Sequence, residues 1–215
     1  MLTLDAVWKS PPNHPGSPIL QDCSYTFEAG LIYAILGTSG TGKTTLLRML
    51  NNLVDVDRGR ILLNGTDINT LHPSQVRRRI SMQFQTPAFT GITVEDNLAF
   101  ARRYSQRDQV DFQGLLQRVH LDPACLHRPV ASLSVGQQQR VCLARTLVTQ
   151  PDVLLLDEPT AALDEDTAER IMELVREVSA AEELLTIFVT HSKAQARKLG
   201  NVLLELRDGK LQGIA

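Results

Sequence analysis

Apolar and polar residues follow one another in short stretches that predict a succession of strands and helices. The runs at 31–36 and 153–156 are continuously apolar, which is typical of strands covered on both faces. Residues 2–8 alternate between apolar and polar, as a strand with one solvent-facing side does. The stretch 19–27 is its expected antiparallel partner.

Turn and capping residues mark where the remaining elements begin. Further strands are expected at 60–63, 80–84, 153–157, 184–190 and 201–206, and further helices at 73–79, 165–180 and 192–199. The Asn-Gly turn at 64–65 indicates a short hairpin, and Pro73 suits the first turn of a helix. From about 86 to 150 the pattern is helical, with helices expected to open at Thr93, Asp108 and Ser134. This order predicts an α/β fold with a mostly parallel sheet, antiparallel strands near the N-terminus and helices inserted around 86–140.

Composition narrows the possible classes of protein. The 215 residues suit one domain, and 43% hydrophobic residues can form a sizeable core. A net charge of −2 gives no sign of a nucleic-acid partner, so the arginine clusters at 77–79 and 102–103 are interpreted as solvated helix faces. The three cysteines lack metal-ligand spacing and are expected to be reduced thiols. No stretch approaches the ~18 apolar residues of a membrane span.

A glycine-rich loop joins the apolar run 31–36 to a helical run that starts near residue 42. The loop reads Gly37-Thr38-Ser39-Gly40-Thr41-Gly42-Lys43-Thr44, followed by Thr45. Its glycines let successive backbone N–H groups point at one anion, and the helix adds its positive dipole end. Lys43 is expected to reach the outer phosphates of a nucleotide, and the Thr44 hydroxyl to ligate Mg²⁺. The sequence therefore predicts a nucleotide-phosphate site formed by this loop.

Two acidic residues end the apolar run 153–156. Ligands bind at the carboxyl ends of strands in doubly wound sheets, so Asp157 is expected to hold Mg²⁺ directly or through water. Glu158 is the expected general base, or water-orienting group, for attack on the γ-phosphate. The pair therefore predicts hydrolysis of the nucleotide.

Six short motifs follow one another along the chain. After the phosphate loop come Gln85, Leu133-Ser134-Val135-Gly136-Gln137, the acidic pair at 157–158, Ala161-Ala162-Leu163-Asp164 and His191. This ordered set resembles that of the ATP-binding cassette (ABC) ATPases, and the resemblance covers nearly the whole chain. It implies a single domain with a P-loop NTPase core. The core and the antiparallel strands take up 1–85 and 150–215, and a helical subdomain takes up about 86–149.

The resemblance also assigns roles to the motifs around the phosphates. Gln85 matches the family glutamine that contacts Mg²⁺ and the attacking water, with Gln83 as a nearby alternative. His191 matches the switch histidine that contacts the γ-phosphate. Asp164 is expected to act across a dimer interface.

The motif at 133–137 is the signature motif of the resembling family. Ser134 suits the N-cap of the following helix, whose N-terminus can bind an anion. In the family, the residues that match Ser134 and Gly136 close on the γ-phosphate of a nucleotide held by the opposite subunit, and Gln137 is expected to support the loop. Val135 stands where the family has a glycine. The sequence leaves open how this departure affects nucleotide affinity and closure.

The surface beneath the adenine base is open to three interpretations. The family places an aromatic residue near the end of the first strand. Trp8 is close to that position, the strand alignment puts Ser10 there, and His14 is another candidate. Trp8 as an ordinary packing residue is an equal alternative.

The resemblance finally implies partners and a setting. It implies hydrolysis of ATP with Mg²⁺ by two copies of the chain, which sandwich two ATP molecules head to tail. It also implies a multi-span membrane permease, with the chain peripheral on the cytoplasmic face of the inner membrane. The stretches 85–91 and 93–98 more loosely resemble bacterial iron-export and metal-tolerance cassettes. A metal exporter is therefore expected, with a small-solute importer as the alternative.

Two other classes within the resembling family fit less well. Soluble ABC proteins of DNA repair or translation carry a second cassette, a coiled-coil insertion or zinc-binding cysteines, and this chain shows none of them. An assembly factor with little turnover is disfavoured because such cassettes commonly lose the residue at Glu158.

Overall fold

The computed structural model describes residues 1–11, 18–105 and 109–214 and is built around a six-stranded sheet. The strand order is β10-β9-β3-β8-β7-β6, with β3 at Ile32–Leu36, β6 at Ile80–Gln83, β7 at Val153–Asp157, β8 at Leu185–Val189, β9 at Val202–Arg207 and β10 at Lys210–Gly213. All neighbouring pairs are parallel except β9 with β10. The carboxyl ends of β3, β7 and β8 therefore lie at one edge, where a ligand can bind.

Alternating side chains of the central strands pack into two separate hydrophobic cores, one on each face of the sheet. On one face Ala34, Leu154 and Phe188 pack with α6 (Glu165–Ala181), α7 (Lys193–Leu199) and the helices of the 94–148 region. On the other face Ile35 and Leu155 pack with α1 (Lys43–Leu50) and the N-terminal strands. Both faces are covered, which explains the continuous apolar runs.

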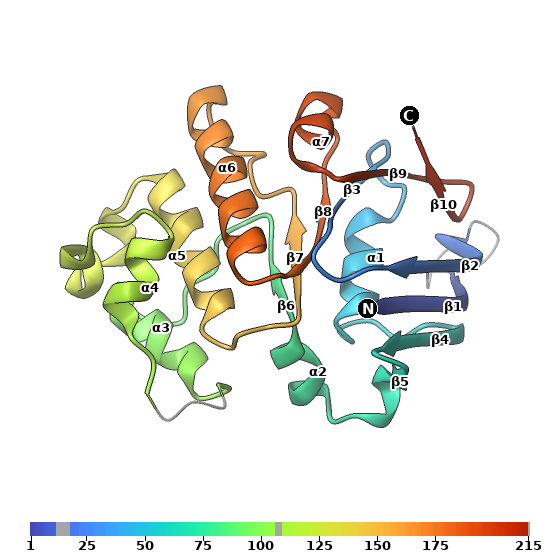
Figure 1. The fold of residues 1–215 in the computed structure, drawn as a ribbon, viewed down its shortest axis with the longest axis horizontal. Helices are drawn as coiled ribbons and strands as arrows, with labels where there is room; N and C mark the ends of the chain where they lie inside the picture. The colour runs from blue at the N-terminus through green and yellow to red at the C-terminus, as the bar shows by residue number, and fades with distance from the viewer. Residues whose placement is uncertain (12–17, 106–108, 215) are drawn as a thin grey trace.

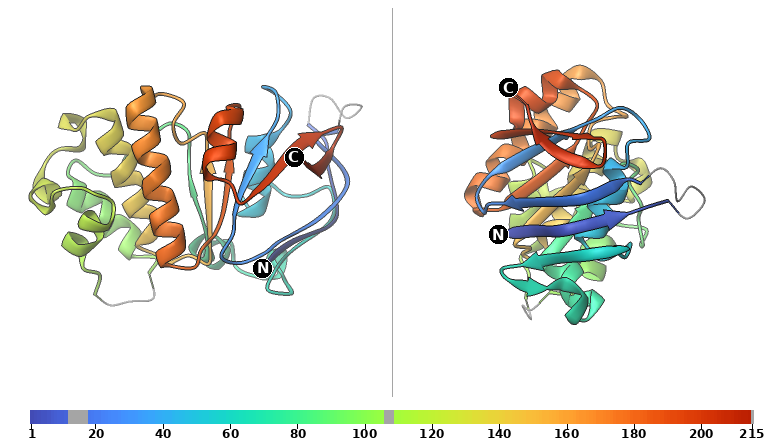
Figure 2. Two further views of the ribbon diagram at one scale, coloured as in Figure 1. Left: turned by 45° about the horizontal axis from the view of Figure 1, so that its top comes forward. Right: turned by 90° about the vertical axis from the view of Figure 1, so that its right-hand side faces the viewer.

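A second sheet covers α1 from the side away from the central sheet (Figure 1). Its order is β2-β1-β4-β5, with β1 at Leu2–Lys9, β2 at Leu20–Phe27, β4 at Arg58–Leu63 and β5 at Thr66–Asp67. All pairs are antiparallel, and Figure 2 shows these strands stacked at one end of the molecule. Asn64 and Gly65 both have positive φ in the β4–β5 turn, which confirms the expected hairpin. A 3₁₀ turn (Ile68–Thr70) and α2 (Pro73–Arg79) lead back to the central sheet.

The helices between β6 and β7 form a lobe at the opposite end of the molecule (Figure 1). They are α3 (Val94–Arg102), α4 (Phe112–Arg118), α5 (Val135–Leu147) and 3₁₀ turns at Pro123–His127 and Val130–Ser132. Thr93 and Ser134 cap α3 and α5 as expected. The helix start expected at Asp108 lies outside the described residues. The structure shows α4 opening three residues later, because the side chain of Asp111 accepts the Gly114 N–H.

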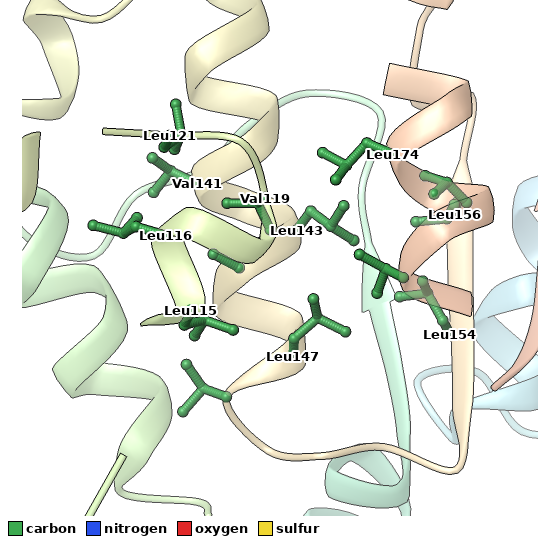
Figure 3. Packing of buried hydrophobic residues seen from close by; sticks show 14 of the residues in the cluster. Leu115, Leu116, Val119, Leu121, Val141, Leu143, Leu147, Leu154, Leu156 and Leu174 are labelled. Carbon is green, nitrogen blue, oxygen red and sulfur yellow. The ribbon is translucent and has the colours of Figure 1, made fainter. Parts of the chain in front are cut away.

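The lobe shares a hydrophobic core with the central sheet. In Figure 3, Leu143 and Leu147 of α5 lie between the α4 side chains on one side and Leu154 and Leu174 on the other. Continuous packing of this kind makes α5 part of both the lobe and the core. The subdomain boundaries at 85/86 and 149/150 stay a prediction.

The C-terminal strands extend further than the apolar pattern indicated. The strand expected at 201–206 is β9, and a hairpin adds β10 at the sheet edge. The carbonyl of Gly209 in this hairpin accepts the N–H of Gln21 in β2, and so joins the two sheets. With its mixed α/β layers, parallel core, antiparallel N-terminal sheet and inserted helices, the structure confirms the expected fold class.

Candidate nucleotide-binding and hydrolysis site

The phosphate loop runs from the carboxyl end of β3 to the first residue of α1, as the sequence predicts. Gly40 and Gly42 have φ values of 81° and 96°, which L-residues with a Cβ rarely adopt. Gly42 is also the N-cap of α1, so the loop ends where the helix dipole begins. The loop therefore presents backbone N–H groups and a helix N-terminus together, as an anion site requires.

The side chain of Lys43 lies folded within the loop. It is 6% exposed, and its Nζ donates to the carbonyls of Gly37 (2.8 Å) and Thr38 (3.0 Å). These two hydrogen bonds offset the free-energy cost of burying the Lys43 ammonium group away from water. The charge is held beside the anion site, within the loop that would surround a phosphate group.

Thr44 and Asp157 are brought together from positions far apart in the sequence. The Thr44 hydroxyl donates to Asp157 Oδ1 at 2.9 Å. Burial raises the pKa of the Asp157 carboxyl, and the Thr44 hydrogen bond works against that rise. A hydroxyl and a carboxylate form an oxygen donor set that suits Mg²⁺, which commonly takes one or two carboxylates plus substrate phosphates. In the described part of the chain, no cluster of three or more His, Cys, Asp or Glu residues could hold a metal alone.

Glu158 follows Asp157 in an unusual backbone conformation. Its φ is +44°, a left-handed region that costs an L-residue about 1–2 kcal/mol. The Glu158 N–H donates to the carbonyl of Val189 at the end of β8. Nδ1 of His191 lies 3.4 Å from Glu158 Oε2. The strand ends of β7 and β8 thus bring the expected base and the expected switch histidine together.

The two candidate glutamines occupy different surroundings. β6 ends at Gln83, earlier than the predicted strand 80–84. The Gln83 side chain is buried and bonds to Gln139. Gln85 is exposed and lines the same cavity as Glu158 and Thr44. The structure therefore places Gln85, and not Gln83, at the phosphate loop.

A cavity of about 500 Å³ lies over the phosphate loop, which is within the size range of small-ligand sites. It is lined by Pro11, Ile19, Ser39, Gly40, Gly42, Lys43, Thr44, Thr45, Gln85 and Glu158. Two of these, Pro11 and Ile19, were not expected from the sequence. Ile19 packs directly on the loop, since a Cβ added to Gly42 would lie 2.1 Å from Ile19 Cγ2. The sequence held no signal for this contact beyond an apolar residue opening the second strand.

The signature residues lie apart from this cavity. Ser134 and Gln137 form a reciprocal capping box at the start of α5, with the Gln137 N–H donating to Ser134 Oγ and the Ser134 N–H to Gln137 Oε1. Val135 is 46% exposed, so its side chain faces outward at the helix N-terminus. None of these residues lines the cavity over the chain's own phosphate loop.

Asp164 lies close to the signature motif within the same chain. It caps α6 by accepting the N–H of Thr167, which lowers the pKa of the Asp164 carboxyl. A Cβ added to Gly136 would lie 2.6 Å from Thr167 Cγ2. Gly136 is therefore required by close packing of α5 on α6, and the two motifs form one surface.

Gln195 is a further residue that sequence reasoning missed. Its Oε1 accepts hydrogen bonds from the Thr160 and Thr190 hydroxyls, both at 3.1 Å. Thr160 follows Glu158 by two residues and Thr190 precedes His191. The Gln195 side chain of α7 thus links, by hydrogen bonds, the two segments that carry the expected base and the switch histidine.

The candidates for the adenine surface are only partly placed by the structure. Trp8 is 37% exposed in β1, and it does not line the cavity. The Ser10 N–H donates to Asp57 at 2.7 Å, which fixes the backbone just before the cavity residue Pro11. His14 lies outside the described residues.

Comparison with known proteins decides the family. Residues 20–161 match the family model described as ABC transporter. The chain belongs to the ABC transporter ATP-binding family. The cassettes of this family bind ATP and are ATPases, and the motif order, the fold and the phosphate loop described above are those of an ABC cassette.

Relatives of this cassette differ in what their names say they transport. It is 39% identical over 198 residues to Protein STAR1 of Oryza sativa subsp. japonica. This alignment covers 91% of this chain and 57% of the relative. It is 36% identical over 197 residues to FetA of Escherichia coli (strain K12), named for iron export, covering 90% and 88%. It is 40% identical over 210 residues to PstB 2 of Mycobacterium tuberculosis (strain ATCC 25618 / H37Rv), named for phosphate import, covering 91% and 75%.

Solved cassettes have the same fold. CbiO1 of Clostridium perfringens, part of the transporter complex cbiONQ, superposes with a TM-score of 0.87 at 26% identity over 98% of this chain and 86% of that one. The bacterial cassette MJ0796, solved as a dimer, gives 0.82 at 26% identity over 99% and 97%. A post-hydrolysis state of the MJ0796 dimer holds ADP and Pi. In the described residues of this cassette, no helix has the length and apolar character of a membrane span.

Proposed function

We propose that this cassette is the ATP-hydrolysing subunit of a membrane transporter, with its catalytic residues at the edge where β3, β7 and β8 end. The observation that carries the proposal is the convergence of Lys43, Thr44, Gln85 and Glu158 on one cavity, with Asp157 bonded to Thr44. Groups that orient phosphates, a carboxylate base and oxygen ligands are the parts that phosphoryl transfer needs.

Each group has a distinct task in this proposal. The loop N–H groups and Lys43 bind and orient the β- and γ-phosphates. Glu158 accepts the proton of the water that attacks the γ-phosphate, and Gln85 orients that water. His191, 3.4 Å from Glu158, contacts the γ-phosphate from the neighbouring strand end. Thr44, Asp157 and Gln85 would hold Mg²⁺, which neutralises phosphate charge when bound.

The separation of the signature motif from the cavity supports a two-chain arrangement. Ser134 and Gly136 stand at the N-terminus of α5, which can bind an anion, yet their own chain holds its phosphate loop elsewhere. A second copy, turned head to tail, can bring its signature motif onto this cavity, with Asp164 beside it at the contact. The dimeric state of the MJ0796 cassette agrees with this arrangement.

A groove beside the glutamine segment is the proposed docking surface for the permease. This cavity of about 460 Å³ is lined mainly by apolar atoms, with Leu53, Phe84 and Phe100 at least 37% exposed. Arg77, Arg78 and Arg145 also line it, and none of its described lining residues is acidic. Phe84 immediately precedes Gln85, which lines the nucleotide cavity. A partner that contacts Phe84 would therefore lie one residue away from that cavity.

The walls of the same groove indicate the chemistry of its occupant. An amphipathic permease segment with acidic side chains would fit both the apolar walls and the arginines. It would hold the cassette against the cytoplasmic face of the inner membrane.

The transported substrate we propose is a metal ion moved outward. This rests on the FetA relative and on the stretches 85–91 and 93–98, and PstB 2 makes a small-solute importer the alternative. Transport of Fe²⁺ into inside-out vesicles that contain the cassette and its genome-neighbour permease tests the direction. ATP-dependent accumulation is expected, whereas phosphate transport into right-side-out vesicles would favour the importer.

Glu158→Gln tests the proposed hydrolysis. The variant keeps the size of the side chain, so ATP binding is expected to stay near wild type while kcat falls by ~10²–10⁴-fold, the usual contribution of a general base. Glu173→Gln, the same change at an exposed position on α6, is the matched control and should turn over normally. Because hydrolysis reopens the sandwich, Glu158→Gln should elute as two chains with ATP in size-exclusion chromatography.

Three results would count against parts of this function. Wild-type turnover in Glu158→Gln would remove Glu158 as the base and leave His191 as the next candidate. A variant that stays monomeric with ATP would contradict the two-chain sandwich. A permease that still co-purifies with Leu53→Asp and Phe100→Asp cassettes would contradict the proposed groove.

A further inference from the structure

The signature helix α5 also contacts the backbone of the glutamine segment 85–88. Three of its residues, spaced three apart, face that segment: Gln139, Cys142 and Arg145. Residues at this spacing lie on the same side of a helix. The signature motif opens this same helix at Ser134, so one rigid element carries both the signature and the supports of the glutamine segment.

Gln139 forms the contact nearest the site. It is 1% exposed, and its Nε2 donates to the backbone carbonyl of Gln85 at 3.3 Å. Its Oε1 accepts from Gln83 Nε2 at 2.5 Å. Gln83 ends β6 and pairs in register with Leu156, next to Asp157. Two amide groups thus connect the end of the central sheet, the signature helix and the peptide of Gln85.

Arg145 and Cys142 hold the segment three residues further on. Arg145 Nη1 donates to the carbonyl of Ala88 at 2.5 Å. A backbone hydrogen bond from Ala88 to the Cys142 thiol opposes the rise in thiol pKa that burial causes. Among these supports only Gln139 reaches the peptide of Gln85 itself.

Hydrogen bonds to the carbonyls of Gln85 and Ala88 couple α5 to the glutamine segment. A 13-residue helix spans about 20 Å as one rigid rod. In Figure 3 its side chains are packed on both sides, and close-packed interiors transmit displacements. A displacement of α5 relative to the phosphate loop therefore shifts the carbonyl of Gln85 through its bond to Gln139.

We propose that Gln139 is a positioning residue that sets the location of Gln85 at the γ-phosphate according to the orientation of the signature helix. The inference rests on the proposed function, since it assigns Gln139 a part in that hydrolysis. Gln139 does not line the cavity, and it acts only through Gln85. Its loss removes correct placement of Gln85 while leaving the phosphate loop unchanged.

Gln139→Met tests this inference because Met keeps the length of the side chain and removes both amide hydrogen bonds. We expect kcat to fall about tenfold, a change equivalent to ~1.4 kcal/mol in the barrier. The Kd for a fluorescent ATP analogue should stay within about twofold, because Gln139 does not line the cavity.

A double-mutant cycle with Gln85→Ala separates positioning from a general structural defect. If Gln139 acts through Gln85, adding Gln139→Met to Gln85→Ala should lower kcat by less than about twofold more, a strongly non-additive result. Gln138→Met is the matched control. Gln138 lies next to Gln139 but bonds to the carbonyls of Val130 and Leu133, so its effect should multiply with that of Gln85→Ala.

The outcomes are distinct. Additive effects of Gln139→Met and Gln85→Ala, or weakened nucleotide binding in Gln139→Met, would overturn the inference. If Gln139→Met does not fold, Gln83→Met decides, since it removes the donor that orients Gln139. It should lower kcat at constant Kd and be non-additive with Gln85→Ala, and additivity there would overturn the inference. A wild-type cassette without ATPase activity would instead refute the proposed function.

Discussion

Gly42→Ala should destabilise the cassette through two separable effects, both visible in the geometry of the phosphate loop. The φ of Gly42 is 96°, and a left-handed conformation costs an L-residue about 1–2 kcal/mol. The new Cβ would also lie 2.1 Å from Ile19 Cγ2. Overpacking of this kind costs typically about 1–3 kcal/mol, so the total loss is about 2–5 kcal/mol.

Thermal unfolding without nucleotide is the appropriate assay. For a domain of this size ~1 kcal/mol shifts Tm by about 2–4 °C, so Gly42→Ala should lower Tm by about 4–20 °C. Gly40→Ala is the matched control, because Gly40 has a φ of 81° but no atom within 4 Å of its added Cβ. It carries backbone strain alone, and its Tm should fall by about 2–8 °C.

The double variant Ile19→Ala/Gly42→Ala isolates the steric part. Removing the Ile19 branches opens the space, so the two changes should be non-additive by about 1–3 kcal/mol in the stabilising direction. The reasoning would be refuted if Gly42→Ala cost no more than Gly40→Ala. Additive free energies in the double variant would show that Ile19 does not pack on the loop.

Three further predictions concern charge and the signature motif. Lys43→Ala should weaken ATP binding by about tenfold or more in a nucleotide titration, because charge-assisted hydrogen bonds contribute ~1.5–3 kcal/mol, and wild-type affinity would remove Lys43 from the phosphate site. Ser134→Arg should leave nucleotide binding by the single chain nearly intact but abolish ATP-dependent dimerisation and turnover, and a normal rate would contradict the two-chain model. The pKa of Asp157 is raised by burial, so the protonated carboxyl is favoured in the folded state. The stability that the protonated form contributes is lost as pH rises through the pKa of the folded state. Asp157→Asn should therefore raise the Tm of the nucleotide-free protein at pH 7, by a margin that shrinks as pH falls toward 3.8, the usual pKa of the carboxyl; an equal margin at every pH would contradict this cause.

Local sequence was sufficient wherever the physical cause is local. Glycines that allow positive φ predicted the phosphate loop, and a side-chain cap predicted the starts of α3 and α5 at Thr93 and Ser134. The sequence did not single out Asp111 as the cap of α4, because several polar residues precede this helix and only the observed bond to Gly114 selects Asp111. β10 was not expected, although Asp208 and Gly209, which both have positive φ in its turn with β9, form the kind of turn that joins hairpin strands.

The motif residues and their shared site could be named from sequence, but their direct contacts could not. The Thr44–Asp157 bond joins residues 113 positions apart, and Gln195 bonds to Thr160 from 35 positions away. The contact of Ile19 with Gly42 and the amide chain through Gln139 likewise depend on how separate elements pack.

The sequence by itself therefore determined the family motifs, the α/β class and the chemistry available at each strand end. Only the tertiary structure decided that Gln85 rather than Gln83 faces the cavity, and it agrees with the resemblance in keeping the signature motif away from its own chain's phosphate loop. The physical reason is range: capping, turn and alternation preferences act over a few residues. Contacts between distant segments depend instead on how the sheets and helices pack, which no short stretch of sequence encodes.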